Sequence, residues 1–314
     1  MMILVTGASG LLGANFILES RSRQVDVIAI NHHHSVRIPG VKVVQADLTN
    51  PAIVDKVVSS FRPQWIVNCA SITNVDWCEA HPKETRDIHV NASLYLANAA
   101  RKVGAKLAYI STDSVFDGAK DSDYYYKEED PCVPLNIYAA TKLAGEQVVQ
   151  ENLPSSLIVR TNIYGWNLQN KQSLAEWMFN ELMAQNQILC FHDVFFTPIL
   201  ANDLADILFE MIGQELAGVY HVTGSLACSK FEFALKLADI FHLNRDLIRA
   251  ISINDSPLQA PRPKNTPLST SKITSELGGH MPDVLSGINR FKLLREMGFA
   301  SLIKTWQEVE ECQS

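Results

Sequence analysis

Tyr138 and Lys142 are the two residues of this sequence best placed to carry out chemistry. They stand four positions apart at the start of a predicted helix, residues 137–151, so the phenol and the ammonium lie on one face. A neighbouring lysine favours the phenolate and lowers the phenol pKa from its ordinary value of about 10. The pair therefore predicts a proton donor for a carbonyl oxygen, with Tyr138 as the acid.

A second polar stretch follows the predicted strand at residues 107–111, where Thr112 and Asp113 come next in the chain. Enzymes built on parallel sheets place their reactive groups beyond the carboxyl ends of the strands. The strand therefore points Thr112 and Asp113 toward the same edge of the sheet as the tyrosine and lysine.

A glycine-rich turn lies between the first predicted strand, residues 3–6, and the first predicted helix, residues 11–20. Gly7 permits the tight turn, Gly10 lets the backbone approach a pyrophosphate, and Gly13 lets helix and strand pack closely. The free amides of the helix start are suited to phosphate groups. The turn predicts dinucleotide binding, with contacts from Ser9, Leu11 and Leu12 as well as the glycines.

The residue after the second predicted strand bears on which dinucleotide binds. An acid usually contacts the ribose hydroxyls of NAD at this position, but the chain has Asn31, which does not repel a 2′-phosphate. Arg37 and the histidines at 32–34 follow and could meet such a phosphate. NADP is therefore at least as probable as NAD. Asp47 and Leu48 end the third predicted strand, where Asp47 either reaches the adenine or caps the next helix.

Strands and helices alternate along the first half of the chain, which is the pattern of a parallel sheet with crossover helices. Several strands are apolar without alternation, as expected when helices cover both faces. We expect an α/β Rossmann fold with a doubly wound parallel sheet. The predicted strands are residues 3–6, 25–30, 41–45, 65–69, 107–111 and 157–160, and the predicted helices are 11–20, 51–60, 84–103 and 137–151.

The second half is less regular and reads as a smaller α+β lobe. We expect a dinucleotide-binding domain over residues 1–165 and a substrate-binding lobe over 166–314, with segments near 200–225 returning to the first domain. The predicted elements are helices at 173–185, 201–212 and 230–241, strands at 188–191 and 218–222, and a packing helix after residue 281. Four prolines in residues 257–267 mark a binding loop.

Composition and charge exclude several classes of protein. The 314 residues carry a net charge of −7, which argues against nucleic acid as a partner. We find no apolar run of about 18 residues and no leader at the N-terminus, so we expect a cytoplasmic protein outside the membrane. The six cysteines are scattered without metal-type spacing, and we expect reduced thiols and no metal site.

Taken together, these motifs resemble an extended short-chain dehydrogenase/reductase of the dTDP-4-dehydrorhamnose reductase-like family. The resemblance covers about 270 residues, from the glycine-rich turn to a proline loop at 261–268. It is carried by the stretches RPQWIVNCA at 62–70, STDSVFDG at 111–118, PLNIY at 134–138 and KLAGE at 142–146. Ser114 stands where this family usually has a tyrosine, and residues 161–165 lack a tryptophan often found in the sugar pocket.

The resemblance implies a role for each matching residue. Thr112 would hydrogen-bond the substrate carbonyl, Tyr138 would protonate it, and Lys142 would hold the nicotinamide ribose. Asp113 would face the sugar, and Arg262 would grip the substrate's diphosphate. The residues implied to line the cofactor after the fourth strand are Cys69, Ala70, Ser71 and Thr73.

The implied activity is reduction of the 4-keto group of a nucleotide-linked deoxysugar by NADPH or NADH, in a chain that could form a homodimer. Two alternatives share the same motifs. One is a nucleotide-sugar epimerase, dehydratase or decarboxylase that keeps NAD tightly bound. The other is a non-catalytic, NADP-binding regulatory subunit similar to the β-subunit of methionine adenosyltransferase.

Overall fold

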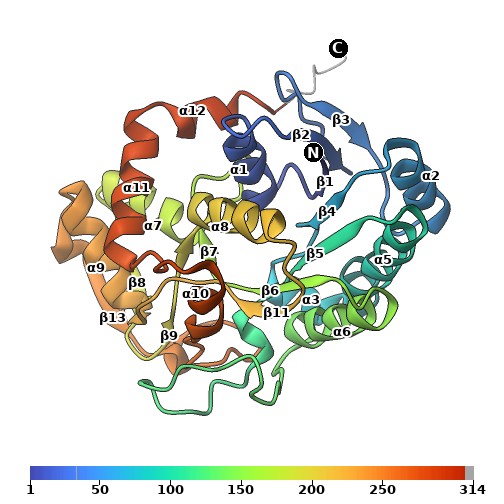
Figure 1. Cartoon of the computed structure of the whole chain (residues 1–314). Coiled ribbons are helices and arrows are strands. Elements are labelled where there is room, and N and C mark those ends of the chain that lie inside the picture. Colours follow the sequence, from blue (N-terminus) through green and yellow to red (C-terminus); the bar gives the residue numbers. More distant parts are fainter. Residues whose placement is uncertain (33, 308–314) are drawn as a thin grey trace.

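A single parallel sheet forms the centre of the protein (Figure 1). The computed structural model describes residues 1–32 and 34–307. Its seven sheet strands follow the order β11-β6-β5-β4-β1-β2-β3, and all neighbours pair in parallel. This confirms the predicted doubly wound α/β fold. The strands are β1 (Met2–Thr6), β2 (Asp26–Asn31), β3 (Lys42–Gln45), β4 (Trp65–Asn68), β5 (Lys106–Ile110), β6 (Leu157–Arg160) and β11 (Gly218–His221).

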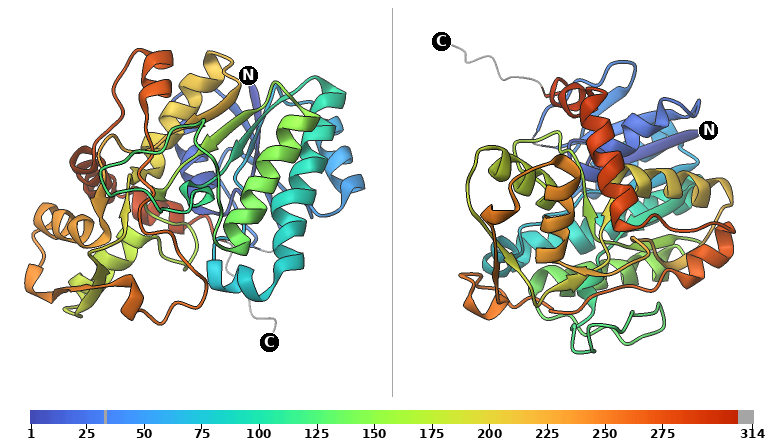
Figure 2. Two further views of the ribbon diagram at one scale, coloured as in Figure 1. Left: turned by 90° about the horizontal axis from the view of Figure 1, so that it is seen from below. Right: turned by 90° about the vertical axis from the view of Figure 1, so that its left-hand side faces the viewer.

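Helices cover both faces of the sheet, so its strands are apolar on both sides. On one face α1 (Leu11–Ser20) packs against α8 (Ala201–Gly213). On the other face α2 (Pro51–Phe61), α5 (Ala92–Val103) and α6 (Ile137–Asn152) lie side by side (Figures 1 and 2). Neighbouring residues of one strand divide between the two cores: Ile3 faces the first and Leu4 the second.

Local sequence signals set the ends of these helices. The Asn50 side chain accepts hydrogen bonds from the Ala52 and Ile53 amides at the start of α2, and Pro51 takes the first helical position. Gly104 ends α5 with a φ of +75°, a left-handed conformation that glycine adopts without strain.

The predicted helix at residues 84–103 is confirmed as a helical segment, but its first turns are not a regular α-helix. The chain forms α3 (Val75–Ala80) and α4 (Pro82–Arg86), and a π-helical turn (Asp87–Asn91) then leads into α5. A π turn inserts one residue into the helical ladder, which rotates the side chains that follow. Apolar periodicity spans this region without interruption, so it contains no signal for the extra residue.

A smaller lobe stands beside the sheet (Figure 1, left). Here β8 (Ile188–Phe191) pairs in parallel with β13 (Ile248–Ile251), and both contact α9 (Lys230–Phe241). Two shorter pairs join β9 (Phe195–Phe196) to β12 (Cys228–Ser229) and β7 (Ile163–Tyr164) to β10 (Ile199–Leu200). The remaining helices are α7 (Leu174–Met183), α10 (Ser271–Leu277), α11 (Val284–Glu296) and α12 (Phe299–Lys304), and 3₁₀ turns span Asp113–Val115, Arg245–Leu247 and Ile253–Asp255.

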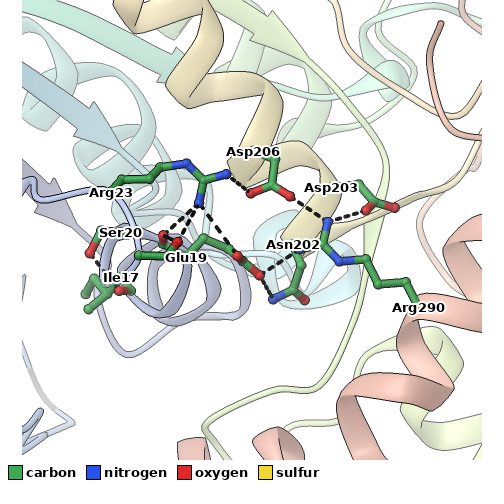
Figure 3. A network of polar contacts seen from close by, with 9 residues as sticks. Ile17, Glu19, Ser20, Arg23, Asn202, Asp203, Asp206 and Arg290 are labelled. Carbon is green, nitrogen blue, oxygen red and sulfur yellow. Dashed lines mark hydrogen bonds and ion pairs between the residues drawn. The ribbon is translucent and has the colours of Figure 1, made fainter. Parts of the chain in front are cut away.

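A polar network connects the first helix of the chain with the C-terminal helices (Figure 3). Arg290 of α11 contacts Asp203 of α8 at 2.5 Å, Asp206 at 2.6 Å and Glu19 of α1 at 2.9 Å. Arg23 contacts Asp206 at 2.6 Å on the opposite side. Burial raises the pKa of Glu19, whereas its contacts with Asn202 and the two arginines act in the opposite direction. Among the described residues, no helix is long and apolar enough to span a bilayer.

Candidate active site

A cavity of about 1110 Å³ opens at the carboxyl ends of the sheet strands. It lies where β1 has β4 on one side and β2 on the other, the position at which doubly wound sheets bind ligands. Of the predicted site residues, Gly13, Arg37 and Arg262 do not line it. Those that do are Gly7, Ser9, Gly10, Leu11, Leu12, Asn31, Asp47, Leu48, Cys69, Ala70, Ser71, Thr73, Thr112, Asp113, Tyr138 and Lys142.

The glycine-rich turn has the shape that a pyrophosphate requires. Gly7 has a φ of +63°, and a Cβ atom there would lie 2.8 Å from the backbone nitrogen of Ala70. A Cβ atom on Gly13 would lie 2.3 Å from the Gly7 carbonyl oxygen, so Gly13 serves helix packing rather than the cavity wall. Gly10 begins α1 without a side-chain cap, which leaves first-turn amides for an anion.

The far end of the cavity offers an acceptor for a sugar hydroxyl. The Asn31 amide nitrogen donates to the His34 carbonyl at 2.8 Å, which fixes the amide orientation. Its Oδ1 atom is buried and has no hydrogen-bond partner among the described residues. A ribose hydroxyl of a dinucleotide would satisfy this oxygen, so the site fits the group that the glycine turn predicts. Asp47 Oδ1 accepts hydrogen bonds from the Thr49 amide at 2.9 Å and the Thr49 hydroxyl at 2.7 Å.

Arg37 is not brought to this end of the cavity. Its side chain is exposed, and its backbone amide donates to the Trp306 carbonyl at 2.8 Å. The expected contact between Arg37 and a 2′-phosphate is therefore absent from this arrangement. His33, which we grouped with Arg37, lies outside the described residues.

Tyr138 lies in the first turn of α6, which begins where the Asn136 side chain accepts a hydrogen bond from the Ala139 amide at 2.9 Å. Burial raises the pKa of Tyr138 to about 12, and the neighbouring Thr112 hydroxyl lowers it only in part. The predicted lowering of this pKa by Lys142 is wrong here, because burial outweighs the Thr112 hydrogen bond and the nearby Asp113 and Cys78 raise the pKa further. Tyr138 is consequently a neutral phenol at pH 7, the form that can donate a proton.

Lys142 follows one turn later and is 2% exposed. Its ammonium donates to the Ile110 carbonyl at 2.6 Å and lies 4.1 Å from the centre of the Tyr109 ring. Burial lowers the pKa of Lys142 to about 7, although the Glu146 carboxylate acts in the opposite direction. The amine can therefore gain and lose a proton near neutral pH.

Asp113 is held in place by donors from three parts of the chain. Its carboxylate accepts hydrogen bonds from the Thr112 hydroxyl at 3.1 Å, the Asn162 amide at 2.7 Å and the Thr266 hydroxyl at 2.7 Å. These bonds tie the end of β5 to the loop after β6 and to the proline loop. Asp113 thus fixes the position of Thr112, in addition to lining the cavity.

The proline loop is fastened to the margin of the cavity. The Asn136 amide, two residues before Tyr138, donates to the Pro261 carbonyl at 2.8 Å. Arg262 lies 3.2 Å from the Asp76 carboxylate of α3, and the Ala260 amide donates to the same carboxylate at 2.9 Å. The guanidinium of Arg262 is thus bound by its own chain in this structure, beside the cavity rather than in its wall.

Sequence reasoning missed His89, which joins the two sides of the site. This fully buried histidine comes from the π turn, and its Nε2 atom accepts a hydrogen bond from the Ile72 amide at 3.1 Å. Nδ1 therefore carries the proton and donates to the Thr141 hydroxyl at 2.8 Å. The His89 ring also lies edge-on to the Tyr138 ring, with 5.6 Å between the ring centroids. Burial and the nearby Lys142 hold the pKa of His89 well below its ordinary value, which keeps the ring neutral.

The described residues contain no cluster of three or more His, Cys, Asp and Glu side chains that could hold a metal ion. The five cysteines within the described residues are free thiols, and Cys312 lies outside them.

Comparison with known proteins places this site in a family. The family model of the RmlD substrate binding domain matches residues 1–293. The methionine adenosyltransferase 2 subunit beta of Pongo abelii is 34% identical, with 89% of this chain and 84% of that protein aligned. The probable low-salt glycan biosynthesis reductase Agl14 of Haloferax volcanii is 28% identical, over 90% of this chain and 94% of that protein.

A solved structure agrees with the fold. The dTDP-4-dehydrorhamnose reductase of Bacillus anthracis, determined in complex with NADP, superimposes with a TM-score of 0.82. It is 30% identical and covers 93% of this chain and 98% of its own. On the match over residues 1–293, this protein belongs to the RmlD substrate binding domain family of extended short-chain dehydrogenases/reductases.

Proposed function

We propose that this protein is an NAD(P)H-dependent reductase that acts on the 4-keto group of a nucleotide-activated deoxysugar. The observation that carries the proposal is the joint placement of Thr112, Tyr138 and Lys142 along one cavity with the glycine-rich turn. Similarity to a dTDP-4-dehydrorhamnose reductase and to a glycan biosynthesis reductase supports the same class of reaction.

Each residue of the cleft has a separate role in a carbonyl reduction. The reduced nicotinamide supplies, when bound, the hydride that goes to the carbonyl carbon. The Thr112 hydroxyl turns its proton from the Asp113 carboxylate to the carbonyl oxygen, and Tyr138 donates its phenol proton to that oxygen, so the ketone becomes an alcohol. Lys142 holds the nicotinamide ribose. Because the pKa of Lys142 is about 7, this amine can also pass a proton from solvent back toward the phenolate.

The remaining site residues serve binding. Gly7, Ser9 and Gly10 hold the cofactor's pyrophosphate, and Asn31 contacts its adenosine ribose. Cys69, Ala70, Ser71 and Thr73 line the wall after β4. We further propose that Arg262 exchanges its bond with Asp76 for the substrate's diphosphate when a sugar nucleotide enters.

The test compares turnover by the natural protein with turnover by Tyr138→Phe, which keeps the ring and removes the proton. We expect NAD(P)H oxidation with a dTDP-4-keto-6-deoxyhexose to fall at least about a hundredfold in the variant. Cofactor affinity, measured by fluorescence titration, should change by less than about threefold. Equal rates for the two proteins would remove Tyr138 from the reaction.

The similarity to the methionine adenosyltransferase subunit favours a second candidate, a regulatory subunit that binds the dinucleotide without turning over a sugar. A protein that binds NADP and yet leaves every sugar nucleotide unchanged would support it. An epimerase or dehydratase would instead be purified with tightly bound, oxidised NAD.

A further inference from the structure

A short segment, residues 167–173, contributes side chains to the lining of the dinucleotide cleft, and we refer to it as the strap. It connects β7 with α7 and touches the cleft wall at two places. The Gln169 side chain donates to the Ser9 hydroxyl at 3.1 Å, within the glycine-rich turn. The Lys171 ammonium donates to the Thr73 hydroxyl at 2.6 Å, beyond the end of β4. The strap thus contacts both of the loops that flank the predicted pyrophosphate position.

The C-terminal segment supports the strap from behind. The Lys304 ammonium donates to the Gln169 carbonyl at 2.8 Å, and the Gln307 amide donates to the Leu168 carbonyl at 2.7 Å. Within the strap, the Asn167 amide donates to the Lys171 carbonyl at 2.6 Å. These bonds hold the backbone of the strap, whereas the Lys171 side chain is held at its end by the Thr73 hydroxyl alone among the hydrogen bonds of the described residues.

The cleft offers few cationic side chains to a bound diphosphate. Lys142 and Lys171 are the only lysine or arginine side chains among the described residues that line it. Lys142 is buried against the Ile110 carbonyl at the reactive end. The cleft is otherwise acidic, since its lining includes Asp47, Glu84, Asp87 and Asp113. The net charge of −7 gives no general attraction for an anion, so recognition must come from a local cation.

Lys171 has the properties of that cation. Its ammonium is bonded to a neutral hydroxyl, and within the described part of the chain no carboxylate lies at ion-pair distance from it. A lysine ammonium binds phosphate oxygens as a point charge and can follow them on its flexible stem. Exchange of the Thr73 hydroxyl for a phosphate oxygen would give a stronger, charge-assisted bond.

We propose that Lys171 binds the diphosphate of the nicotinamide cofactor and that the strap closes the cleft over it. This inference rests on the dinucleotide cleft of the proposed function, but not on the identity of the sugar. A nucleotide sugar also carries a diphosphate. The contact between Gln169 and Ser9 assigns Lys171 to the cofactor, because it places the strap beside the glycine-rich turn.

The experiment measures binding rather than turnover, with ADP-ribose as a probe for the cofactor's diphosphate and dTDP as a probe for the substrate's. Titration calorimetry compares the natural protein with Lys171→Met and Lys171→Arg. Lys56→Met is the matched control, because Lys56 is an exposed lysine on α2 that does not line the cleft. Circular dichroism confirms that each variant is folded.

We expect Lys171→Met to weaken ADP-ribose binding at least about tenfold and to reduce the dependence of that binding on salt. Lys171→Arg should retain affinity within about threefold, and the Lys56→Met control within about twofold. Binding of dTDP should stay within about twofold in every variant.

Unchanged ADP-ribose binding by Lys171→Met would overturn the proposal. A loss of dTDP binding equal to or larger than the loss for ADP-ribose would overturn it as well, because the lysine would then serve the substrate. Failure of the proposed reductase activity is a separate outcome, since the protein can bind ADP-ribose normally while reducing no sugar.

Discussion

Two buried groups in the cleft, the Tyr138 phenol and the Lys142 amine, have pKa values displaced in opposite directions by the same cause. Burial disfavours the charged form of each group, so it raises the pKa of Tyr138 to about 12 and lowers the pKa of Lys142 to about 7. At neutral pH the tyrosine holds its proton while the lysine is poised to exchange one. That combination suits a proton donor that must be recharged after each turnover.

The lowered pKa of Lys142 predicts a specific dependence of stability on pH. Between pH 7 and about 10.4 the unfolded chain keeps a proton that the folded chain has lost, so this group makes stability rise with pH. Below pH 7 Lys142 is protonated in both the folded and the unfolded chain, so the full free-energy cost of burying its charge remains. The Lys142→Met variant lacks this contribution. From pH 7 to pH 9, urea unfolding should show the natural protein gaining on the order of 1–3 kcal/mol relative to the variant.

Comparing the natural protein with Lys142→Met cancels the stability contributions of the other groups that titrate between pH 7 and pH 9. If the two unfolding free energies change in parallel from pH 7 to pH 9, Lys142 is not the group whose charge burial disfavours.

For individual site residues, the sequence predicted which residues line the site better than it predicted which groups they contact. Thr112, Tyr138 and Lys142 could be identified because strand ends and helix starts are readable from local patterns. Arg37 and Arg262 were expected in the site because they are close to it along the chain or by resemblance. The Arg262 guanidinium instead contacts the Asp76 carboxylate, and the Arg37 backbone amide donates to the Trp306 carbonyl. Both partners come from segments far away in the sequence, which local patterns do not connect.

Among the elements, the π turn before α5 does the most to shape the site. Its extra residue turns His89 inward, where the ring receives the Ile72 amide and donates to Thr141 on the catalytic helix. One side chain thereby fixes the distance between the loop after β4 and the first turn of α6. His89 is neutral and touches Tyr138 only through its ring edge, so it acts as a positioning residue.

We expect His89→Leu to leave the Ile72 amide without its partner and to cost about 1–3 kcal/mol of folding free energy. The looser attachment of α6 should lower kcat at least about tenfold, whereas KM for the sugar nucleotide should stay within about threefold. Steady-state kinetics on the folded variant separates these two effects.

His89→Gln is the matched comparison, since its amide offers one acceptor and one donor in place of the ring nitrogens. Partial recovery of kcat in this variant would support the positioning role. A folded His89→Leu protein with undiminished kcat would exclude it.

The elements themselves were largely readable from the sequence, and the exceptions have physical reasons. Strands such as β6 and helices such as α9 have strong apolar patterns and caps, including a capping box formed by Ser229 and Glu232. The two-residue strands β7, β9, β10 and β12 were missed because so short a segment has no periodicity. Their pairing depends on tertiary contacts.

On the scale of the whole molecule, helix α6 and the residue stretch after β5 carry the reactive groups, and segments from the C-terminal half lie beside them. The network around Arg290 fixes α11 to α1 and α8 (Figure 3). The strap contacts the glycine-rich turn through Gln169, and the proline loop contacts Asn136. Both segments therefore lie at the cleft that would hold the cofactor and the substrate. This arrangement favours a reaction in which water is kept from the reduced cofactor.

The most direct test of the central claim follows a hydride through one turnover. The protein is mixed with a dTDP-4-keto-6-deoxyhexose and NAD(P)H in which both hydrogens at C4 of the nicotinamide are deuterium, and the products are analysed by mass spectrometry. We predict one cofactor oxidised for each sugar reduced, with one deuterium at C4 of the product. A product without deuterium and without net cofactor oxidation, or no product from a protein that binds the cofactor, would contradict the proposed reductase.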